Sequence, residues 1–140
     1  MVLHVRAGVN PAKIVICHTD IDIDLTYIKA LLDKGAFVEF DNFGKEFYID
    51  PADRGFAGGI FARDIDRVRT IKALIDCGYE EQLLIANDLC LKCMLRHYGG
   101  WGYDHIVRNV VPMMLDVGIS KESVKGLLEN NPRMVLEASS

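Results

Sequence analysis

The sequence lacks the features of several broad classes of protein. No apolar run approaches the roughly 18–20 residues that a membrane-spanning helix needs, and the first residues do not have the order of a secretory signal peptide. Lysine and arginine form no cluster, and the formal net charge is −4. Because nucleic acids and anionic membranes attract clustered basic residues, we expect neither as a partner, and we expect a cytoplasmic location.

Nucleotide-binding motifs and paired metal-binding cysteines are missing as well. No G-x-G-x-x-G follows a strand-like segment, and no G-x-x-x-x-G-K-[ST] occurs. Of the four cysteines, Cys90 and Cys93 form one C-x-x-C, but Cys17 and Cys77 are isolated. A structural zinc site needs a second pair, and a redox C-x-x-C opens a helix rather than following a strand. We therefore expect reduced thiols in a cytoplasmic protein.

What is present is an alternation of strand-like and helix-like segments in a chain of 140 residues, a length typical of one domain. Apolar, β-branched segments predict strands at 13–17, 36–40 and 82–88. Apolar residues at helical spacing predict helices at 24–35, 63–78, 105–118 and 120–132. This alternation predicts an α/β fold with a parallel sheet, either an open doubly wound sheet or part of a (β/α)₈ barrel.

Polar side chains follow each predicted strand. The strand ends carry His18, Asp20, Asp41, Asn42 and Asp88. In a (β/α)₈ barrel the functional groups lie at the carboxyl ends of the strands, so this regularity favours the barrel. His18 and Asp88 would then share one barrel mouth, where an imidazole and a carboxylate suit Zn²⁺ or a similar ion. The alternative for His18 is a hydrogen-bonded core histidine.

The acidic segment ICHTDIDIDL at 16–25 invites comparison with a calcium loop. A loop of that type starting at Asp20 needs glycine at its sixth position and glutamate at its twelfth, where this chain has Leu25 and Leu31. We therefore interpret Asp22 and Asp24 as acids at the N-terminus of the following helix, where the helix dipole favours them. Asp20 stays a candidate for the pocket.

Two loops are further candidates for the site. In YGGWGYDHI, Trp101 and Tyr103 either pack against the protein or line the mouth of the pocket. The long segment 43–63 follows the second predicted strand, so in a barrel it would overlie the site. Its glycines suit a mobile lid or plain disorder equally well.

Several motifs together resemble one known family. ICHTD, GAFVEFDNFG, RVRTIKALIDCGYEEQLLIAND, YGGWGYDHIVRNVVPMMLDVGIS and LLENNPRMVL occur in this order. They resemble the C-terminal portion of the phosphotriesterase family, a branch of the amidohydrolase superfamily, over nearly the whole chain. The resemblance implies that residues 1–140 form a single partial (β/α)₈ barrel domain, comprising about strands six to eight with their helices.

The resemblance also implies a binuclear metal centre, expected to hold zinc, at the barrel mouth. His18 matches a metal ligand at the end of strand six. Asp88 matches the aspartate of strand eight, which binds metal and accepts a proton as the catalytic residue. Two divalent ions lower the pKa of a bridging water, so that hydroxide attacks a lactone, a carboxylic ester or a phosphoester. A neighbouring carboxylate, such as Asp41, is expected to support the strand end.

The chain also departs from the family pattern. The other ligands expected from the family, a His-x-His pair, a bridging lysine or glutamate and a further histidine, belong to earlier strands. Some members carry histidine or arginine where this chain has Asn42, and asparagine cannot shuttle a proton at neutral pH, so efficient triester hydrolysis is not expected. The chain starts in a helix-like segment at 2–9, which suggests a missing N-terminal half of the barrel. The alternative is an inactive fragment or interaction subunit that forms an oligomer through its open sheet edges.

Overall fold

The protein is described from a computed structural model, which covers residues 8–49 and 59–137. The helix-like segment at 2–9 lies almost wholly outside these residues. The centre of the fold is a three-stranded sheet in the order β1–β2–β5. The strands are β1 (Val15–Ile16), β2 (Phe37–Phe40) and β5 (Leu83–Ile85). Both pairings are parallel, with Ile16 opposite Val38 and Val38 opposite Leu83, which confirms the predicted α/β fold with a parallel sheet.

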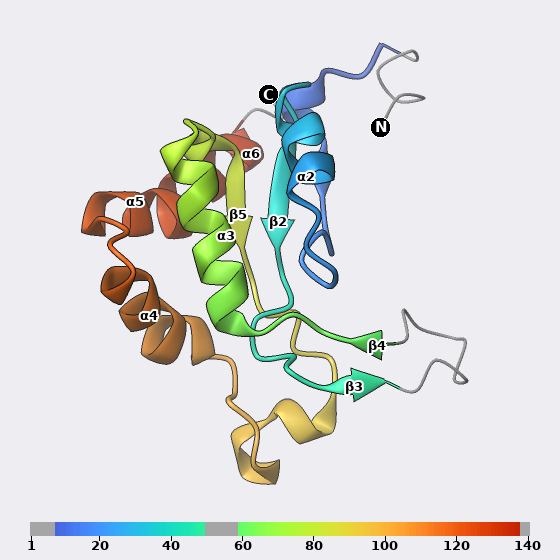
Figure 1. The fold of residues 1–140 in the computed structure, drawn as a ribbon, viewed down its shortest axis with the longest axis vertical. Helices are drawn as coiled ribbons and strands as arrows, with labels where there is room; N and C mark the ends of the chain where they lie inside the picture. The colour runs from blue at the N-terminus through green and yellow to red at the C-terminus, as the bar shows by residue number, and fades with distance from the viewer. Residues whose placement is uncertain (1–7, 50–58, 138–140) are drawn as a thin grey trace.

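Helices cover one side of this sheet. The principal helices are α2 (Leu25–Leu32), α3 (Asp64–Asp76), α4 (Val111–Asp116), α5 (Lys121–Lys125) and α6 (Asn131–Glu137). Helix α2 contacts β2, α3 contacts α4, and α6 contacts β5. Figure 1 shows α2 and α3 in front of the sheet and α4 and α5 beyond α3. Short 3₁₀ segments, η1 (Pro11–Lys13), η2 (Glu80–Gln82), η3 (Lys92–Met94) and η4 (Arg96–Tyr98), occupy the connections.

The core lies between the sheet and these helices. Val38 and Phe40, alternate residues of β2, are fully buried. Side chains of α3 meet them at a spacing of three to four residues, as the sequence predicted. The fully buried apolar partners include Ile28, Val68, Ile71, Leu74, Leu83, Val110, Met114 and Leu127. Each such side chain contributes about 1.5–3 kcal/mol by its removal from water, so this core holds the three strand ends in a fixed register.

Local signals explain where the helices start. Asp24 accepts hydrogen bonds from the backbone N–H groups of Thr26 and Tyr27 at 2.9 and 3.0 Å, so it caps α2 at the helix N-terminus where the sequence placed it. Ser120 caps α5 in the same way, accepting from Ser123 N at 2.9 Å. The acidic segment before α2 therefore ends in a helix cap.

Two segments differ from the sequence prediction. The described part of segment 43–63 contains the antiparallel strands β3 (Tyr48–Ile49) and β4 (Gly59–Ile60), which the sequence did not predict; residues 50–58 of the expected lid or disordered segment lie outside the described ranges. The predicted helix 105–118 begins as a π-helical turn, η5 (Ile106–Val110), before α4. Pro112 lies in the first turn of α4, where its missing N–H cannot complete the usual α-helical ladder. A second π-helical turn, η6 (Gly126–Asn130), joins α5 to α6.

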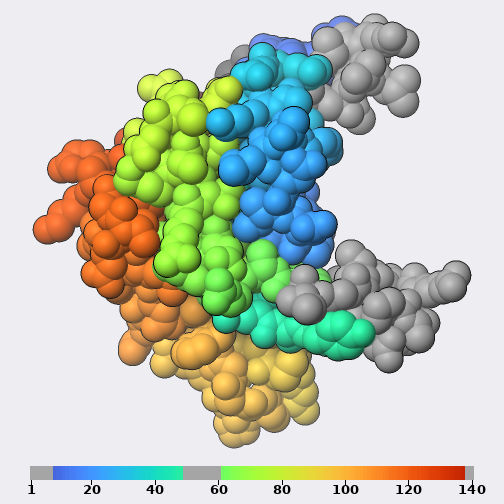
Figure 2. Space-filling model, in the orientation of Figure 1, coloured from blue at the N-terminus to red at the C-terminus, as the bar shows by residue number. Residues whose placement is uncertain are grey.

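The sheet has two outer edges. Among the described residues, β1 pairs only with β2 on one side and β5 pairs only with β2 on the other. The side chains of β1 are only half-buried, whereas Val38 and Phe40 of the central strand are completely buried. Figure 2 shows the helical face as a continuous packed surface, with the segment around 90–105 projecting beyond the sheet. No helix in the described ranges is both long and apolar enough to span a membrane.

Candidate functional site

The candidate site lies at the carboxyl ends of the three parallel strands. The chain leaves β1 at Cys17, β2 at Asp41 and β5 at Ala86, all toward the same end of the sheet. Figure 1 shows β3, β4 and the segment after β5 gathered at this end. The parallel register therefore brings together side chains that are 20 to 70 residues apart in the sequence, roughly as the polar strand ends predicted.

Asp41 holds His18 at two atoms. The backbone N–H of His18 donates to Asp41 Oδ1 at 3.0 Å, and the ring Nδ1–H donates to Asp41 Oδ2 at 2.7 Å. His18 adopts a left-handed backbone conformation, with φ of 58°. The ring is 54% exposed, whereas the Asp41 side chain is 6% exposed. With Nδ1 engaged by a carboxylate, Nε2 is the nitrogen left to bind a ligand, which is the usual arrangement of a metal-binding histidine.

The same pair shifts two pKa values. The hydrogen bond to Asp41 raises the pKa of His18 above its ordinary value, and the charges of Asp41 and Asp88 act in the same direction. Burial raises the pKa of Asp41, while its hydrogen bond with His18 opposes that change. Because the charge of Asp88 acts on His18, the two predicted metal ligands share one electrostatic environment.

Asp88 pairs with a lysine that the sequence prediction missed. The side chain of Asp88 is 38% exposed, and its backbone has a positive φ of 35°. Lys45 Nζ forms an ion pair with Asp88 Oδ2 and donates to Asn42 Oδ1 at 3.1 Å. The Lys45 side chain is only 4% exposed. Lys45 lies five residues beyond the end of β2, and a basic residue so soon after a polar strand end was the available signal.

Asn42 joins these pairs into one hydrogen-bonded unit. Its Nδ2 donates to Asp41 Oδ1 at 2.9 Å and to Asp20 Oδ1 at 2.6 Å, while its Oδ1 accepts from Lys45. Its backbone N–H donates to Asp20 Oδ2 at 3.0 Å. Asn42 is almost completely buried. Its amide therefore connects the ends of β1 and β2, a positioning role that suits a side chain without a titratable proton.

Beneath this unit lies a buried ionic network of Asp20, Arg67, Asp64 and His105. Arg67 Nε donates to Asp20 Oδ2 at 2.8 Å, and Arg67 Nη1 donates to Asp64 Oδ1 at 3.0 Å. His105 Nε2 lies 2.6 Å from Asp64 Oδ2. Arg67 and Asp20 are both fully buried. Asp20, which was a candidate for the substrate pocket, is thus engaged below the surface as the counter-ion of Arg67.

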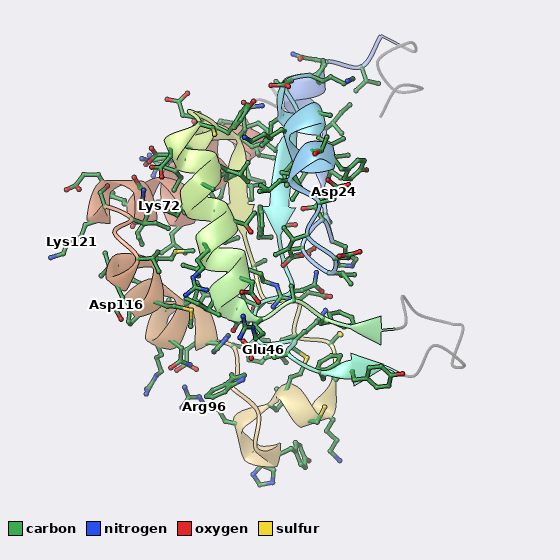
Figure 3. The ribbon with its side chains drawn as sticks, in the orientation of Figure 1. Asp24, Glu46, Lys72, Arg96, Asp116 and Lys121 are labelled. Carbon is green, nitrogen blue, oxygen red and sulfur yellow. The ribbon has the colours of Figure 1, made fainter. Side chains whose placement is uncertain are left out.

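The network also fixes the start of α3. Gly44 N donates to both oxygens of Asp64, at 3.0 and 3.1 Å, and Asp64 N donates to Glu46 Oε1 at 2.6 Å. Figure 3 shows Glu46 beside the first turn of α3. Arg67 could have been noticed in the sequence, because it lies on the apolar face of α3 beside Val68 and Ile71. A charged residue on such a face needs a buried partner, and here it has two.

The remaining pocket candidates, Trp101 and Tyr103, are both exposed, at 57% and 76%. Trp101 stacks on His105 with ring centroids 5.3 Å apart, so it covers one end of the buried ionic network. Trp101 also borders an open groove of about 580 Å³, which is lined by Arg96, Gly99, Gly100, Trp101, Arg108 and Asn109. Figure 3 shows Arg96 on the segment that follows β5.

Cys17 lies next to His18 at the end of β1. Its thiol donates to Glu39 Oε2 at 3.2 Å, and with Asp41 these residues form a compact group of metal-competent atoms within 4.8 Å of one another. Burial, followed by the hydrogen bond to Glu39, raises the pKa of Cys17 to about 11. The protonated thiol is therefore a hydrogen-bond donor to Glu39. All four cysteines are free and exposed.

The donor set fits part of a divalent metal site. His18 offers the Nε2 of a neutral imidazole whose Nδ1 is held by a carboxylate. Asp88 offers a carboxylate at the same end of the sheet. Two ligands do not complete the coordination of one ion, and much less that of two. The remaining ligands would have to come from other strands of a barrel.

Comparison with known proteins agrees with this geometry. The model of the phosphotriesterase family matches residues 1–136. The chain is 35% identical over 132 residues to N-acetyltaurine hydrolase of Xenopus tropicalis. The match covers 94% of this chain and 37% of that protein. It is similar to the crystal structure of a resiniferatoxin-binding protein from Rhodobacter sphaeroides, with a TM-score of 0.89, 33% identity and coverage of 98% of this chain and 37% of that one.

A second solved structure is similar over nearly the whole chain. It is the phosphotriesterase homology protein from Escherichia coli, complexed with phosphate in the active site, with a TM-score of 0.80 and 27% identity. The match covers 94% of this chain and 41% of that one. The chain therefore spans well under half of the length of the relatives that it matches.

Proposed function

Because the chain belongs to the phosphotriesterase family, we propose that it is the C-terminal part of a metal-dependent hydrolase. In this proposal residues 1–140 form one partial barrel domain, and β1, β2 and β5 are strands six, seven and eight of a (β/α)₈ barrel. The parallel order β1–β2–β5 and the similarity to phosphotriesterase-like barrels support this assignment. In the proposed protein, five further strands join these three, and we call that eight-stranded protein the complete barrel.

The observation that carries the proposal is the hydrogen bond to Asp41 that orients the His18 ring, at the same end of the sheet as Asp88. Asp41 fixes the His18 ring through Nδ1, so Nε2 is free to bind a divalent ion, which we propose is zinc. Asp88 would supply a carboxylate to the metal centre and would be the base for the proton lost by an attacking water. When bound, the metal acts as a Lewis acid that activates water and polarises the scissile carbonyl or phosphoryl group.

The substrate class that we propose is a small molecule with a lactone, carboxylic ester, phosphoester or carboxamide bond. The relative named for N-acetyltaurine hydrolysis supports the inclusion of a carboxamide. Asn42 is buried and has no proton to exchange at neutral pH, so it orients Asp41, Asp20 and Lys45 and does not relay protons. Efficient hydrolysis of phosphotriesters is therefore not part of the proposal.

A second candidate function is an interaction subunit without catalytic activity. The observation in its favour is that β1 and β5 each have an edge without a strand partner among the described residues. Exposed edges of a parallel sheet favour association with another chain. In that case the 140-residue chain would form an oligomer and would bind no stoichiometric metal.

The test is a measurement of metal content and hydrolysis on the complete barrel. We expect about two divalent ions per chain by elemental analysis, since the family's chemistry uses a metal pair. Asp88→Asn should abolish hydrolysis of a panel of lactones, esters and amides, whereas Asp116→Asn, which changes an exposed aspartate on α4, should not. Full hydrolysis by Asp88→Asn, or a metal-free complete barrel that hydrolyses the panel, would overturn the proposal.

A further inference from the structure

Lys45 is a buried cation at the edge of the candidate site. It follows β2 by five residues, and its side chain is only 4% exposed. Lysine is almost never buried to this extent without a partner, because its ammonium group loses its hydration. Its position is therefore fixed by specific contacts, and these contacts connect it directly to Asp88 and Asn42.

One N–H donor of the ammonium group has no partner among the residues that the structure describes. A lysine ammonium has three N–H donors, of which Asn42 Oδ1 and Asp88 Oδ2 use two. The other carboxylates close by are already engaged, since Asp41 holds His18 and Asp20 holds Arg67. Asp88 is thus the one carboxylate that forms an ion pair with Lys45 among the residues that the structure describes.

The proposed metal site changes this balance of charge. If Asp88 shares its negative charge with a divalent ion, Lys45 keeps only a part of its counter-charge. A buried cation next to a metal site then leaves the pocket with an excess of positive charge, and a negatively charged group on the substrate would neutralise it. An ammonium group binds carboxylate, sulfonate or phosphate oxygens through short, charge-assisted hydrogen bonds.

We propose that Lys45 is a specificity-determining residue that binds an anionic group of the substrate. This inference rests on the proposed function, and it narrows the substrate class to acidic esters, lactones or amides. The substrate carries a carboxylate, sulfonate or phosphate close enough to the scissile bond to reach Lys45 Nζ while the scissile carbonyl lies at the metal site. Asn42 and Asp88 hold Nζ in place for this contact.

The competing explanation is that Lys45 only positions Asp88. A positioning lysine would support the hydrolysis of charged and neutral substrates alike, because both depend on Asp88. A lysine that binds the substrate anion would affect the charged substrate more strongly. The ratio of the loss of hydrolysis for the charged substrate to the loss for the neutral substrate therefore separates the explanations. This holds even where the substitution slows the hydrolysis of both substrates.

The experiment compares an anionic substrate with its neutral analogue in the complete, metal-loaded barrel. The pair differs only in a carboxylate that is replaced by a carboxamide. For Lys45→Met, kcat/KM for the anionic substrate should fall at least about 10-fold more than for the neutral one, as expected for a lost charge-assisted hydrogen bond. Lys45→Arg should retain part of the preference. Lys72→Met, which removes a surface lysine paired with Asp76, should leave the preference unchanged.

A binding measurement provides a second readout. Calorimetric titration with inorganic sulfate should give a Kd about 10-fold weaker for Lys45→Met than for the wild type, at equal metal content and with cooperative thermal unfolding. Equal losses for both substrates, or unchanged sulfate binding, would overturn the inference. These failures are distinct from failure of the proposed function, which would appear as absent metal or absent hydrolysis in the wild type itself.

Discussion

Asp41 Oδ2 accepts a 2.7 Å hydrogen bond from His18 Nδ1, while Asp41 Oδ1 accepts the backbone N–H of the same residue at 3.0 Å. The carboxylate therefore fixes both the ring and the main chain of His18. It also accepts from Asn42, which is bound to Asp20 and Lys45. One buried carboxylate thus determines which nitrogen of the proposed metal ligand is available.

The first prediction concerns Asp41→Asn. The hydrogen bond to Asp41 raises the pKa of His18, so the substitution should lower that pKa toward its ordinary value of about 6.5. The affinity of the complete barrel for metal should fall about 10–100-fold, as is typical when the partner of a metal-binding histidine is removed. NMR titration of the His18 ring in the metal-free protein and a competitive chelator assay measure the two effects.

The sign of the pH effect is fixed by the direction of the shift. A histidine with a raised pKa in the folded state stabilises the protein fully below its unfolded value of about 6.5 and loses that contribution as pH rises through the folded pKa. In the metal-free wild type, the His18–Asp41 pair should therefore add stability at pH 5.5 relative to pH 8.5. Asp41→Asn should lose that difference, and an unchanged His18 pKa in this variant would contradict the assignment.

The second prediction concerns the buried ionic network. Arg67→Met leaves Asp20 and Asp64 without their guanidinium partner, and both carboxylates are buried. Removal of one member of a buried ion pair typically costs about 3–5 kcal/mol, so we expect a loss of that order in the free energy of unfolding. Chemical denaturation of the complete barrel measures it.

Arg63→Met is the matched control for Arg67→Met. Arg63 also pairs with an aspartate on α3, Asp66, but this pair is exposed to solvent. Exposed pairs contribute about 0–1 kcal/mol, so the control should change stability little. An equal loss of unfolding free energy in both variants would show that the buried network around Asp20 and Asp64 stabilises the fold no more than an exposed ion pair does.

The third prediction distinguishes Asp24, which caps α2, from Asp22, an exposed aspartate in the same acidic segment. Asp24→Ala removes the N-cap of α2 and should cost about 0.5–2 kcal/mol. Asp22→Ala changes an exposed aspartate two residues earlier and should cost almost nothing. Thermal unfolding compares them. Neither variant should alter the metal content, and a loss of metal in Asp24→Ala would contradict its assignment as a helix cap.

The sequence predicted the strands of the fold and the end of the sheet at which the candidate site residues lie. Short apolar segments and helical periodicity located all three parallel strands, and the parallel register then brought His18, Asp41 and Asp88 to one edge. The strand ends could be placed because neighbouring parallel strands end at the same end of a sheet. The family resemblance is confirmed by the match over residues 1–136.

The sequence prediction missed Arg67 and Lys45 for the same physical reason. Arg67 is 47 residues from Asp20, and Lys45 is 43 residues from Asp88, so their partners are set by tertiary packing. Each partner could be identified only after the strand ends had been placed. Asp20 was left as a candidate for the pocket for the same reason, because its acidity is visible in the sequence but its burial against Arg67 is not. The two-residue strands β3 and β4 are too short for a periodicity signal.

The most direct test of the central claim is a crystal structure of the metal-loaded complete barrel with anomalous scattering at the metal absorption edge. Our account predicts that His18 Nε2 and a carboxylate oxygen of Asp88 each bind an ion of the metal pair, at about 2.0–2.2 Å for zinc, with Asp41 still hydrogen-bonded to His18 Nδ1. Anomalous density remote from both residues, or a site completed without either, would contradict it.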